Sequence, residues 1–229
     1  MDRRHFLAAA GSAGLLGLDA CGGSSDAAPP PPAPPPPAAP DWTSLQAGIQ
    51  GTVVLPGAAA YALAAPVFNS VYDATLPQAV VRCASASDVA AALAFARANK
   101  LAVTARSGGH GYTGNATTTG MVIDVGQMNT ITPGSGTATI GAGAKLVDVY
   151  DQLSAQGVCI PSGSCPTIGI AGITQGGGIG VLDRAYGLTC DNLVSAQVVL
   201  ADGSVVTCDA GTHADLDRKS TRLNSSHRP

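Results

Sequence analysis

The feature of this sequence that most constrains its fold is a glycine-rich stretch that is also apolar. It covers Ser162–Gly187, SGSCPTIGIAGITQGGGIGVLDRAYG, with seven glycines from Gly163 to Gly180. Glycine costs backbone entropy on folding, so such a cluster indicates that something approaches the backbone closely. Flexible linkers are rich in glycine and polar residues, whereas here isoleucine, valine and leucine alternate with the glycines. The stretch therefore predicts a buried segment with a flat or anionic cofactor against its backbone N–H groups.

The composition indicates one good-sized domain in a chain of 229 residues with a formal net charge of −3. Between Trp42 and Leu216 there are six Lys or Arg against ten Asp, with no Glu. This balance argues against a nucleic-acid surface. Because no run of about twenty apolar residues occurs, we predict no membrane-spanning helix, and we assign no metal ligands.

The amino-terminal residues 1–26 have the pattern of an export signal. Arg3 and Arg4 precede a short apolar stretch, as in a signal of the twin-arginine type. Leu18–Cys21, followed by two glycines, resembles a bacterial lipoprotein cleavage box and would make Cys21 the site of a lipid anchor. We therefore expect an exported bacterial protein, either periplasmic or a lipoprotein of the cell envelope.

Residues 27–41 form a proline-rich linker in this interpretation. Pro29–Pro40 holds nine prolines in twelve residues, which favours an extended polyproline spacer without packed structure. A proline-rich ligand for a partner module is the alternative.

Residues 42–75 predict a short helix and loops that lead into a domain over 76–216. In that domain Gln78–Cys83 and Leu101–Ala105 are typical of buried strands, and Ser85–Asn99 between them has helix-start signals and helical spacing. Strand, helix and strand make a βαβ unit, so we expect an α/β fold with a partly parallel sheet. Further predicted elements are strands at Met121–Val125 and Thr137–Ile140, a helix at Lys145–Gln156, and a hairpin of Asn192–Leu200 with Ser204–Cys208.

A second glycine-rich loop carries candidate ligand chemistry. Arg106–Gly114 reads RSGGHGYTG and directly follows a predicted strand, which is where α/β folds place their ligand loops. A lone histidine is usually an ordinary hydrogen-bonding residue, but the glycines on both sides of His110 would expose its imidazole to a ligand. Arg106 and Ser107 would offer a cation and a hydroxyl to a pyrophosphate.

RSGGHGYTG followed by GSCPTIGIAGITQGGGIGVLDRAYGLTCDN at Gly163–Asn192 resembles a known family. The two motifs in this order are similar to those of the berberine bridge enzyme-like FAD-linked oxidoreductases, within the vanillyl-alcohol oxidase superfamily. The resemblance covers roughly Leu76–Leu216 and implies a PCMH-type FAD-binding domain of two α/β subdomains that clamp FAD. It also implies bicovalent attachment of the flavin, at the 8α-methyl position through His110 and at C6 through Cys165.

The same resemblance implies that the loop around His110 wraps the pyrophosphate, while the second motif runs along the flavin and its phosphates. The implied FAD-binding residues are Arg106, Ser107, Gly108, Gly109, Gly111, Tyr112, Thr167, Gly169, Gly172, Gly176, Gly177, Gly178 and Gly180. A thiolate and a neutral imidazole are both competent nucleophiles for these attachments.

A disulfide is the alternative use of Cys165. If Cys21 and Cys165 are modified, the cysteines that remain are Cys83, Cys159, Cys190 and Cys208. Four cysteines allow three pairings, and an exported protein could use them. The sequence does not decide among these pairings.

The resemblance implies an FAD-dependent oxidoreductase. It would move a hydride from a C–H bond of an alcohol or sugar-like small molecule to flavin N5 and pass the electrons to O₂ or another acceptor. Ile168 occupies the family position associated with oxygen access, and an isoleucine there favours a dehydrogenase over an oxidase. The alternative function is a non-catalytic, envelope-anchored module that binds a nucleotide-like ligand.

The sequence departs from the family pattern after Leu216. Asp217–His227 reads DRKSTRLNSSH, which looks like a translated sequencing-library adapter. We interpret 217–229 as such an artefact, and a genuine basic tail is the alternative. On this interpretation the substrate domain and the catalytic base are missing, and the fragment itself would be inactive.

Overall fold

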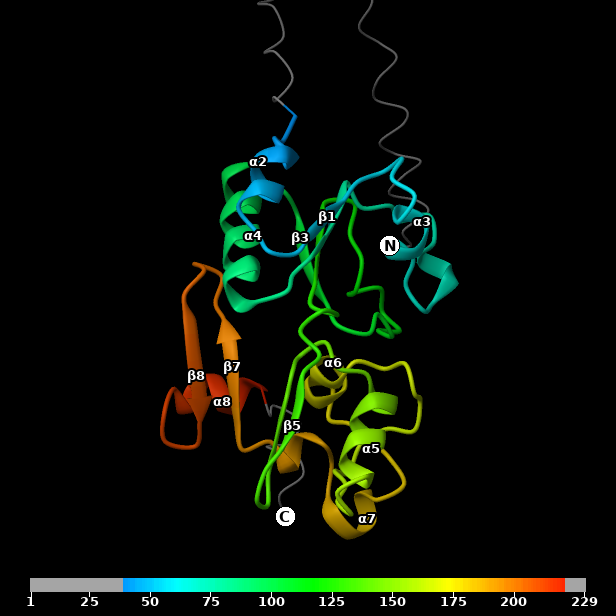
Figure 1. Cartoon of the computed structure of the whole chain (residues 1–229), viewed down its shortest axis with the longest axis vertical. Coiled ribbons are helices and arrows are strands. Elements are labelled where there is room, and N and C mark those ends of the chain that lie inside the picture. The colour runs from blue at the N-terminus through cyan, green and yellow to red at the C-terminus, as the bar shows by residue number, and fades with distance from the viewer. Residues whose placement is uncertain (1–38, 221–229) are drawn as a thin grey trace, which may run out of the picture. The chain divides into compact units, whose positions relative to one another are not determined.

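The computed structural model of the chain describes residues 39–220 (Figure 1). The predicted export signal, Cys21 and nearly all of the proline-rich linker lie outside these residues, so those interpretations stay predictions. Among the described residues, no helix combines the length and the apolar character needed to cross a membrane.

A four-stranded sheet in the order β1-β2-β4-β3 organises the first part of the fold. Its strands are β1 (Thr52–Val54), β2 (Ala79–Arg82), β3 (Val103–Arg106) and β4 (Met121–Asp124). Strand β4 runs parallel to β2 and β3, whereas β1 pairs antiparallel with β2. The predicted α/β class and the partly parallel sheet are confirmed. The two strands of the predicted βαβ unit are not neighbours, because β4 lies between them.

Both faces of the two central strands, β2 and β4, are buried. On one face Val81 and Ile123 pack with α4 (Ala86–Ala98). On the other face Val80 and Val122 pack with residues of α3 (Tyr61–Ala64). Successive side chains of a strand point to opposite faces, so a strand covered on both faces needs a continuous apolar run. The edge strand β3 is not the buried strand that the sequence predicts, because Val103 is 37% exposed.

The Asp88 side chain joins the start of α4 to the segment that precedes β1. Its carboxylate is 2% exposed and accepts N–H bonds from Gln50 at 3.0 Å and from Gly51 and Ala84 at 2.9 Å. Burial by itself raises the pKa of Asp88, but these bonds, with one involving Ser85, outweigh it and leave that pKa below its ordinary value. Asp88 is therefore an ionised anchor inside the fold.

The segment predicted as a helix with loops, 42–75, also contributes strand β1 to the sheet. Its other elements are α2 (Trp42–Ala47), α3 and the 3₁₀ helix η1 (Ser70–Tyr72). Leu45 of α2 belongs to the buried cluster between the sheet and α4, and Trp42 packs against Phe95 with ring centroids 5.1 Å apart. Helix α2 and strand β1 of this segment are thus part of the packed core.

The second part of the fold has its own core, in which two helices pack with a β-hairpin (Figure 1). Its elements are β5 (Ile131–Pro133), β6 (Ala138–Ile140), α5 (Leu146–Ser154), α6 (Ile170–Gln175), α7 (Asp183–Tyr186) and η2 (Cys190–Asn192). Leu146, Val149 and Leu153 are buried at helical spacing along α5, as the sequence predicts. The glycine-rich stretch is not loop throughout, because it contains α6 and α7.

The predicted hairpin after the glycine-rich stretch is confirmed. Strands β7 (Ser195–Val199) and β8 (Val205–Asp209) pair antiparallel, and Gly203 in their connection has φ +91°. Arg97 of α4 donates to the Asp202 carbonyl in this connection at 3.0 Å. Helix α8 (Ala214–Ser220) follows, and it runs past the point at which the adapter-like string begins.

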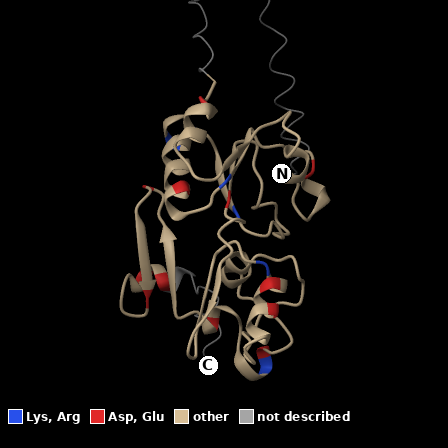
Figure 2. Ribbon diagram, viewed as in Figure 1, with Lys and Arg blue, Asp and Glu red and all other residues tan. Residues whose placement is uncertain are grey.

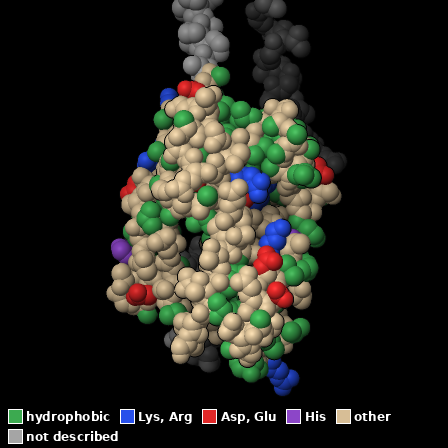
Figure 3. Space-filling model, viewed as in Figure 1, with side chains coloured by type: hydrophobic (Ala, Val, Ile, Leu, Met, Phe, Trp, Pro, Cys, Tyr) green, Lys and Arg blue, Asp and Glu red, His purple; other side chains and the backbone are tan. Residues whose placement is uncertain are grey.

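Charged residues are sparse and scattered along the described part of the chain (Figure 2). On the face shown in Figure 3 they stand as separate points among hydrophobic and neutral side chains. This face of the described residues therefore offers no broad patch of one charge.

Candidate functional site

The two glycine motifs meet backbone to backbone. A Cβ atom built on Gly108 would lie 2.2 Å from the amide nitrogen of Gly169, and one built on Gly169 would lie 2.3 Å from the amide nitrogen of Gly108. No side chain fits at such distances, so both positions require glycine. Beside them, the Ser107 hydroxyl donates to the Ala142 carbonyl at 2.6 Å. The structure thus uses these residues to join the loops, whereas the sequence suggested only contact with a cofactor.

His110 lies where the two motifs meet. Its Nε2 atom lies 2.8 Å from the hydroxyl oxygen of Thr167, which belongs to the second motif. Its ring stacks on Phe68, with ring centroids 4.1 Å apart and planes 18° from parallel. Burial lowers the pKa of His110, and the charge of Lys145 lowers it further. The imidazole is therefore neutral at pH 7 and holds one free lone pair.

Cys165 is exposed and lies in a turn anchored to the start of α5. The carbonyls of Pro166 and Ile168 accept N–H bonds from Val147 and Leu146, both at 3.0 Å. The turn therefore fixes the chain on both sides of the residue that contacts His110. An exposed thiol two residues before Thr167 stands on the segment that meets the His110 loop.

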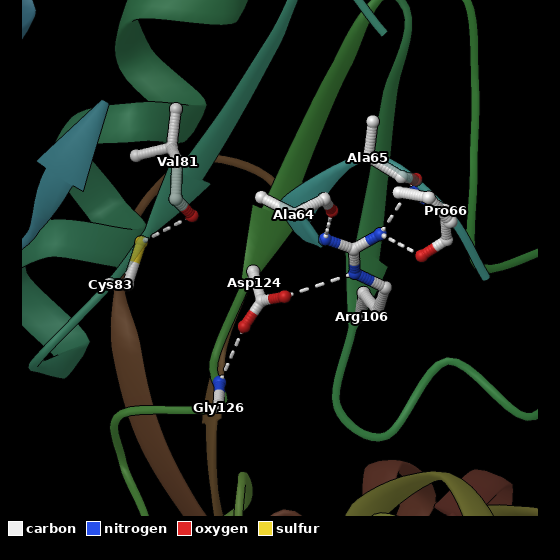
Figure 4. A network of polar contacts seen from close by, with 8 residues as sticks. All are labelled: Ala64, Ala65, Pro66, Val81, Cys83, Arg106, Asp124 and Gly126. Carbon is white, nitrogen blue, oxygen red and sulfur yellow. Dashed lines mark hydrogen bonds and ion pairs between the residues drawn. The ribbon is translucent and has the colours of Figure 1, made fainter. Parts of the chain in front are cut away.

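Arg106 does not present its cation to a ligand, which corrects the sequence-based expectation. The residue is 5% exposed, and its Nε donates to Asp124 at 3.0 Å (Figure 4). Its remaining bonds go to the carbonyls of Ala64, Ala65 and Pro66. The guanidinium donates all of these bonds to protein oxygens, because a buried charge needs hydrogen-bond partners.

Four of the other predicted glycines divide into two pairs. At Gly111 and Gly172 a Cβ atom would meet nothing within 4 Å, so the backbone there stands open. At Gly178 a Cβ atom would lie 2.0 Å from the Thr189 hydroxyl oxygen, and at Gly180 it would lie 1.8 Å from the Ser162 carbonyl oxygen. Of these four, only Gly111 and Gly172 leave room for a cofactor along the direction of the absent side chain.

Four predicted FAD-binding residues have local roles in the structure. Gly109 has φ +73°, which favours glycine, and its carbonyl accepts the Phe68 N–H bond at 3.1 Å. Tyr112 is exposed, and its carbonyl accepts bonds from the 68–75 segment. Gly176 ends α6, and Gly177 follows with φ +102°.

A cavity of about 220 Å³ adjoins the Cys165 turn. It is lined by Tyr150, Cys159, Ile160, Ser162, Gly163, Ser164, Val181 and Leu182. The Tyr150 hydroxyl donates to the Gly163 carbonyl at 2.6 Å, while the buried Ser162 hydroxyl has no hydrogen-bond partner among the described residues. Neither Tyr150 nor Ser162 was among the predicted site residues.

The cysteines of the described range are all free. Cys83, Cys190 and Cys208 are buried, and Cys159 and Cys165 are exposed. Burial, followed by the charges of Asp88 and Asp124, raises the pKa of Cys83 to about 12, so that thiol is inert at neutral pH. None of the disulfide pairings left open by the sequence is formed in this structure.

Residues 77–209 match the family model described as an FAD binding domain. The chain belongs to this family. Its relatives include (R)-6-hydroxynicotine oxidase of Paenarthrobacter nicotinovorans, 35% identical over 73% of this chain and 37% of that enzyme. The resemblance to berberine bridge enzyme-like proteins is also confirmed. The Physcomitrella patens BBE-like 1 structure is 30% identical with a TM-score of 0.74, covering 78% of this chain and 40% of that one.

A further structural relative is described with a flavin attached to a cysteine and a histidine. Glucooligosaccharide oxidase from Acremonium strictum, described with 6-S-cysteinyl, 8α-N1-histidyl FAD, is 26% identical with a TM-score of 0.72. The match covers 78% of this chain and 38% of that enzyme. The chain spans 33% to 37% of the length of the curated relatives it matches most strongly.

The residues of this FAD-binding domain fit its cofactor. The backbone is open at Gly111 and Gly172, a neutral, half-buried imidazole lies between glycines, and a free thiol lies on the second motif. FAD is the cofactor that the family implies, and His110, Cys165 and the open glycines are the residues suited to hold it.

Proposed function

We propose that this FAD-binding domain holds FAD through two covalent bonds, from His110 and from Cys165. The observation that carries the proposal is the 2.8 Å contact between His110 and Thr167, which joins the two attachment motifs at one place. The bicovalent flavin described for the Acremonium strictum oxidase supports it.

The chemistry of the two side chains supports the same proposal. His110 is neutral because burial and Lys145 lower its pKa, so a ring nitrogen is available as a nucleophile. Cys165 is exposed and unpaired in the described residues, so its sulfur is accessible to a ligand. Each bond replaces one hydrogen of the flavin and one proton of the side chain. Two electrons per bond must therefore pass to the acceptor that serves the enzyme.

We further propose that the protein containing this domain is an oxidoreductase for an alcohol or a sugar-like small molecule. Bound FAD supplies the hydride acceptor at N5, and O₂ or another acceptor takes the electrons. The names of relatives that oxidise 6-hydroxynicotine and glucooligosaccharides support a small-molecule substrate. The sequence of residues 1–26 supports an exported protein with Cys21 as a lipid anchor.

Acid precipitation tests the covalent attachment. The chain is expressed with FAD, denatured in acid and separated, and flavin absorbance is measured in the pellet and in the supernatant. We expect the flavin in the pellet. The variants His110→Ala and Cys165→Ala should each keep it there through the remaining bond, with the modified peptide identified by mass spectrometry. Release of all flavin from the parent chain would show noncovalent binding and favour a simple nucleotide-binding module.

A further inference from the structure

Phe68 is the residue that lies against the face of His110. The two rings are stacked at a centroid distance of 4.1 Å, and the Phe68 backbone N–H donates to the Gly109 carbonyl at 3.1 Å. Phe68 is 61% exposed, so its contact with His110 is not part of a buried core cluster. Stacking of this kind restricts the imidazole to one plane.

The segment that carries Phe68 is itself fixed by a buried ion pair. Arg106 donates to the carbonyls of Ala64, Ala65 and Pro66, and its Nε pairs with Asp124 (Figure 4). The last of these carbonyls belongs to Pro66, two residues before Phe68. The ion pair between the ends of β3 and β4 therefore fixes the backbone from which Phe68 reaches His110.

The Thr167 hydroxyl group lies beside Nε2 of His110. Its hydroxyl oxygen lies 2.8 Å from Nε2, and among the described residues no partner contacts Nδ1. A neutral imidazole carries one proton and one free lone pair. A threonine hydroxyl can accept from Nε2–H or donate to Nε2, and the distance fits both arrangements. When Nε2–H donates to Thr167, the lone pair stands on Nδ1, whereas in the reverse arrangement the only lone pair is bonded to the hydroxyl, so only the first leaves a nitrogen free to attack.

We propose that Phe68 and Thr167 are positioning residues for His110, the first fixing the ring plane and the second fixing the proton on Nε2. This proposal rests on the covalent attachment proposed above. It goes further by naming the two side chains that set the rate of the histidyl bond. Neither residue contacts Cys165 through any hydrogen bond or ring contact given by the structure, so the cysteinyl bond should form independently of them.

The test uses the full chain in a Cys165→Ala background, in which covalent flavin reports on His110 alone. FAD is added to the FAD-free protein, and acid-precipitable flavin is followed with time. Phe68→Ala and Thr167→Val should each slow attachment about threefold to tenfold, the loss expected for one aromatic contact or one hydrogen bond. Thr167→Ser should restore the rate. Val71→Ala, which removes another exposed apolar side chain of the same segment, should leave it unchanged.

A second measurement determines which ring nitrogen of His110 is protonated when no flavin is bound. Nitrogen-15 NMR of the FAD-free chain should show His110 protonated on Nε2, and Thr167→Val should shift the ring toward a mixture of tautomers. Parent-like attachment rates in both variants, or a ring protonated on Nδ1, would overturn the proposal. If Cys165→Ala holds no covalent flavin at all, the histidyl bond itself is refuted, and the NMR result alone then decides whether Thr167 sets the tautomer.

Discussion

The amide nitrogen of Gly169 lies only 2.2 Å from the position that a Cβ atom of Gly108 would occupy. These two residues come from different motifs, and their contact is what brings the His110 loop onto the Cys165 segment. The glycines at this crossing are therefore needed by the protein itself, before any cofactor binds.

Gly108→Ala should destabilise the chain strongly. The added methyl group would overlap backbone atoms of residues 167–169, which cannot move as a flexible side chain can. We expect a loss of about 3 kcal/mol in the free energy of unfolding, at the upper end for overpacking, measured by urea denaturation without FAD. Gly111→Ala is the matched control, because nothing lies within 4 Å of its Cβ position. Equal stability of the two variants would refute the packed crossing.

Asp88→Asn should destabilise the fold in a manner that depends on pH. The amide can accept fewer of the bonds from Gln50, Gly51 and Ala84, so we expect a loss of about 3 kcal/mol at pH 7. The folded pKa of Asp88 lies below the unfolded value of about 3.9. Its contribution is thus complete above that value and lost as pH falls through the folded pKa. Urea denaturation of both proteins should show their difference shrinking in acid, and a constant difference would contradict this assignment.

Strongly periodic segments were predictable from the sequence. Helix α4 follows from the Ser85 cap and its spacing, and β7 with β8 follows from alternation around Gly203. Strand β1 was not predictable, because a three-residue strand is recognised only through its pairing with β2. Helix α6 was not predicted, because its segment is rich in glycine and has low helix propensity. The packing of Ile170 in the second core stabilises it instead.

The candidate site was predictable only where a motif carried it. The choice of His110 and Cys165 follows from two ordered motifs, and the structure brings those motifs together at the contact between His110 and Thr167. The roles of the two residues stay predictions. The carbonyls that Arg106 bonds and the ring that stacks on His110 lie about forty residues earlier in the chain. Contacts between residues so far apart in the sequence leave no local pattern. The hydrogen bonds of Arg106 to residues 64–66 and the stacking of Phe68 on His110 were therefore seen only in the structure.

Arg106→Lys should separate the structural role of this cation from a role in phosphate binding. Lysine cannot form the fork of bonds to Asp124 and to the carbonyls of residues 64–66. We expect a loss of about 3 kcal/mol in stability, while the folded fraction binds FAD with nearly parent affinity. Thermal unfolding and FAD titration would be measured on the same sample. Unchanged stability with much weaker FAD binding would instead support the pyrophosphate contact.

Lys145→Met should raise the pKa of His110. Burial is the larger cause of the lowered pKa, and it remains in the variant, so the pKa should move only part of the way back toward its ordinary value. His110 binds its proton less readily in the folded chain than in the unfolded one, so protonation opposes folding as pH falls. Removal of the lysine should weaken that effect. Covalent attachment through His110 in the Cys165→Ala background needs the neutral ring, and its decline in acid should begin at a higher pH in Lys145→Met. Arg184→Met removes another exposed cation and is the control. The His110 titration followed by NMR measures the shift, and identical midpoints for parent and Lys145→Met would show that burial alone lowers this pKa.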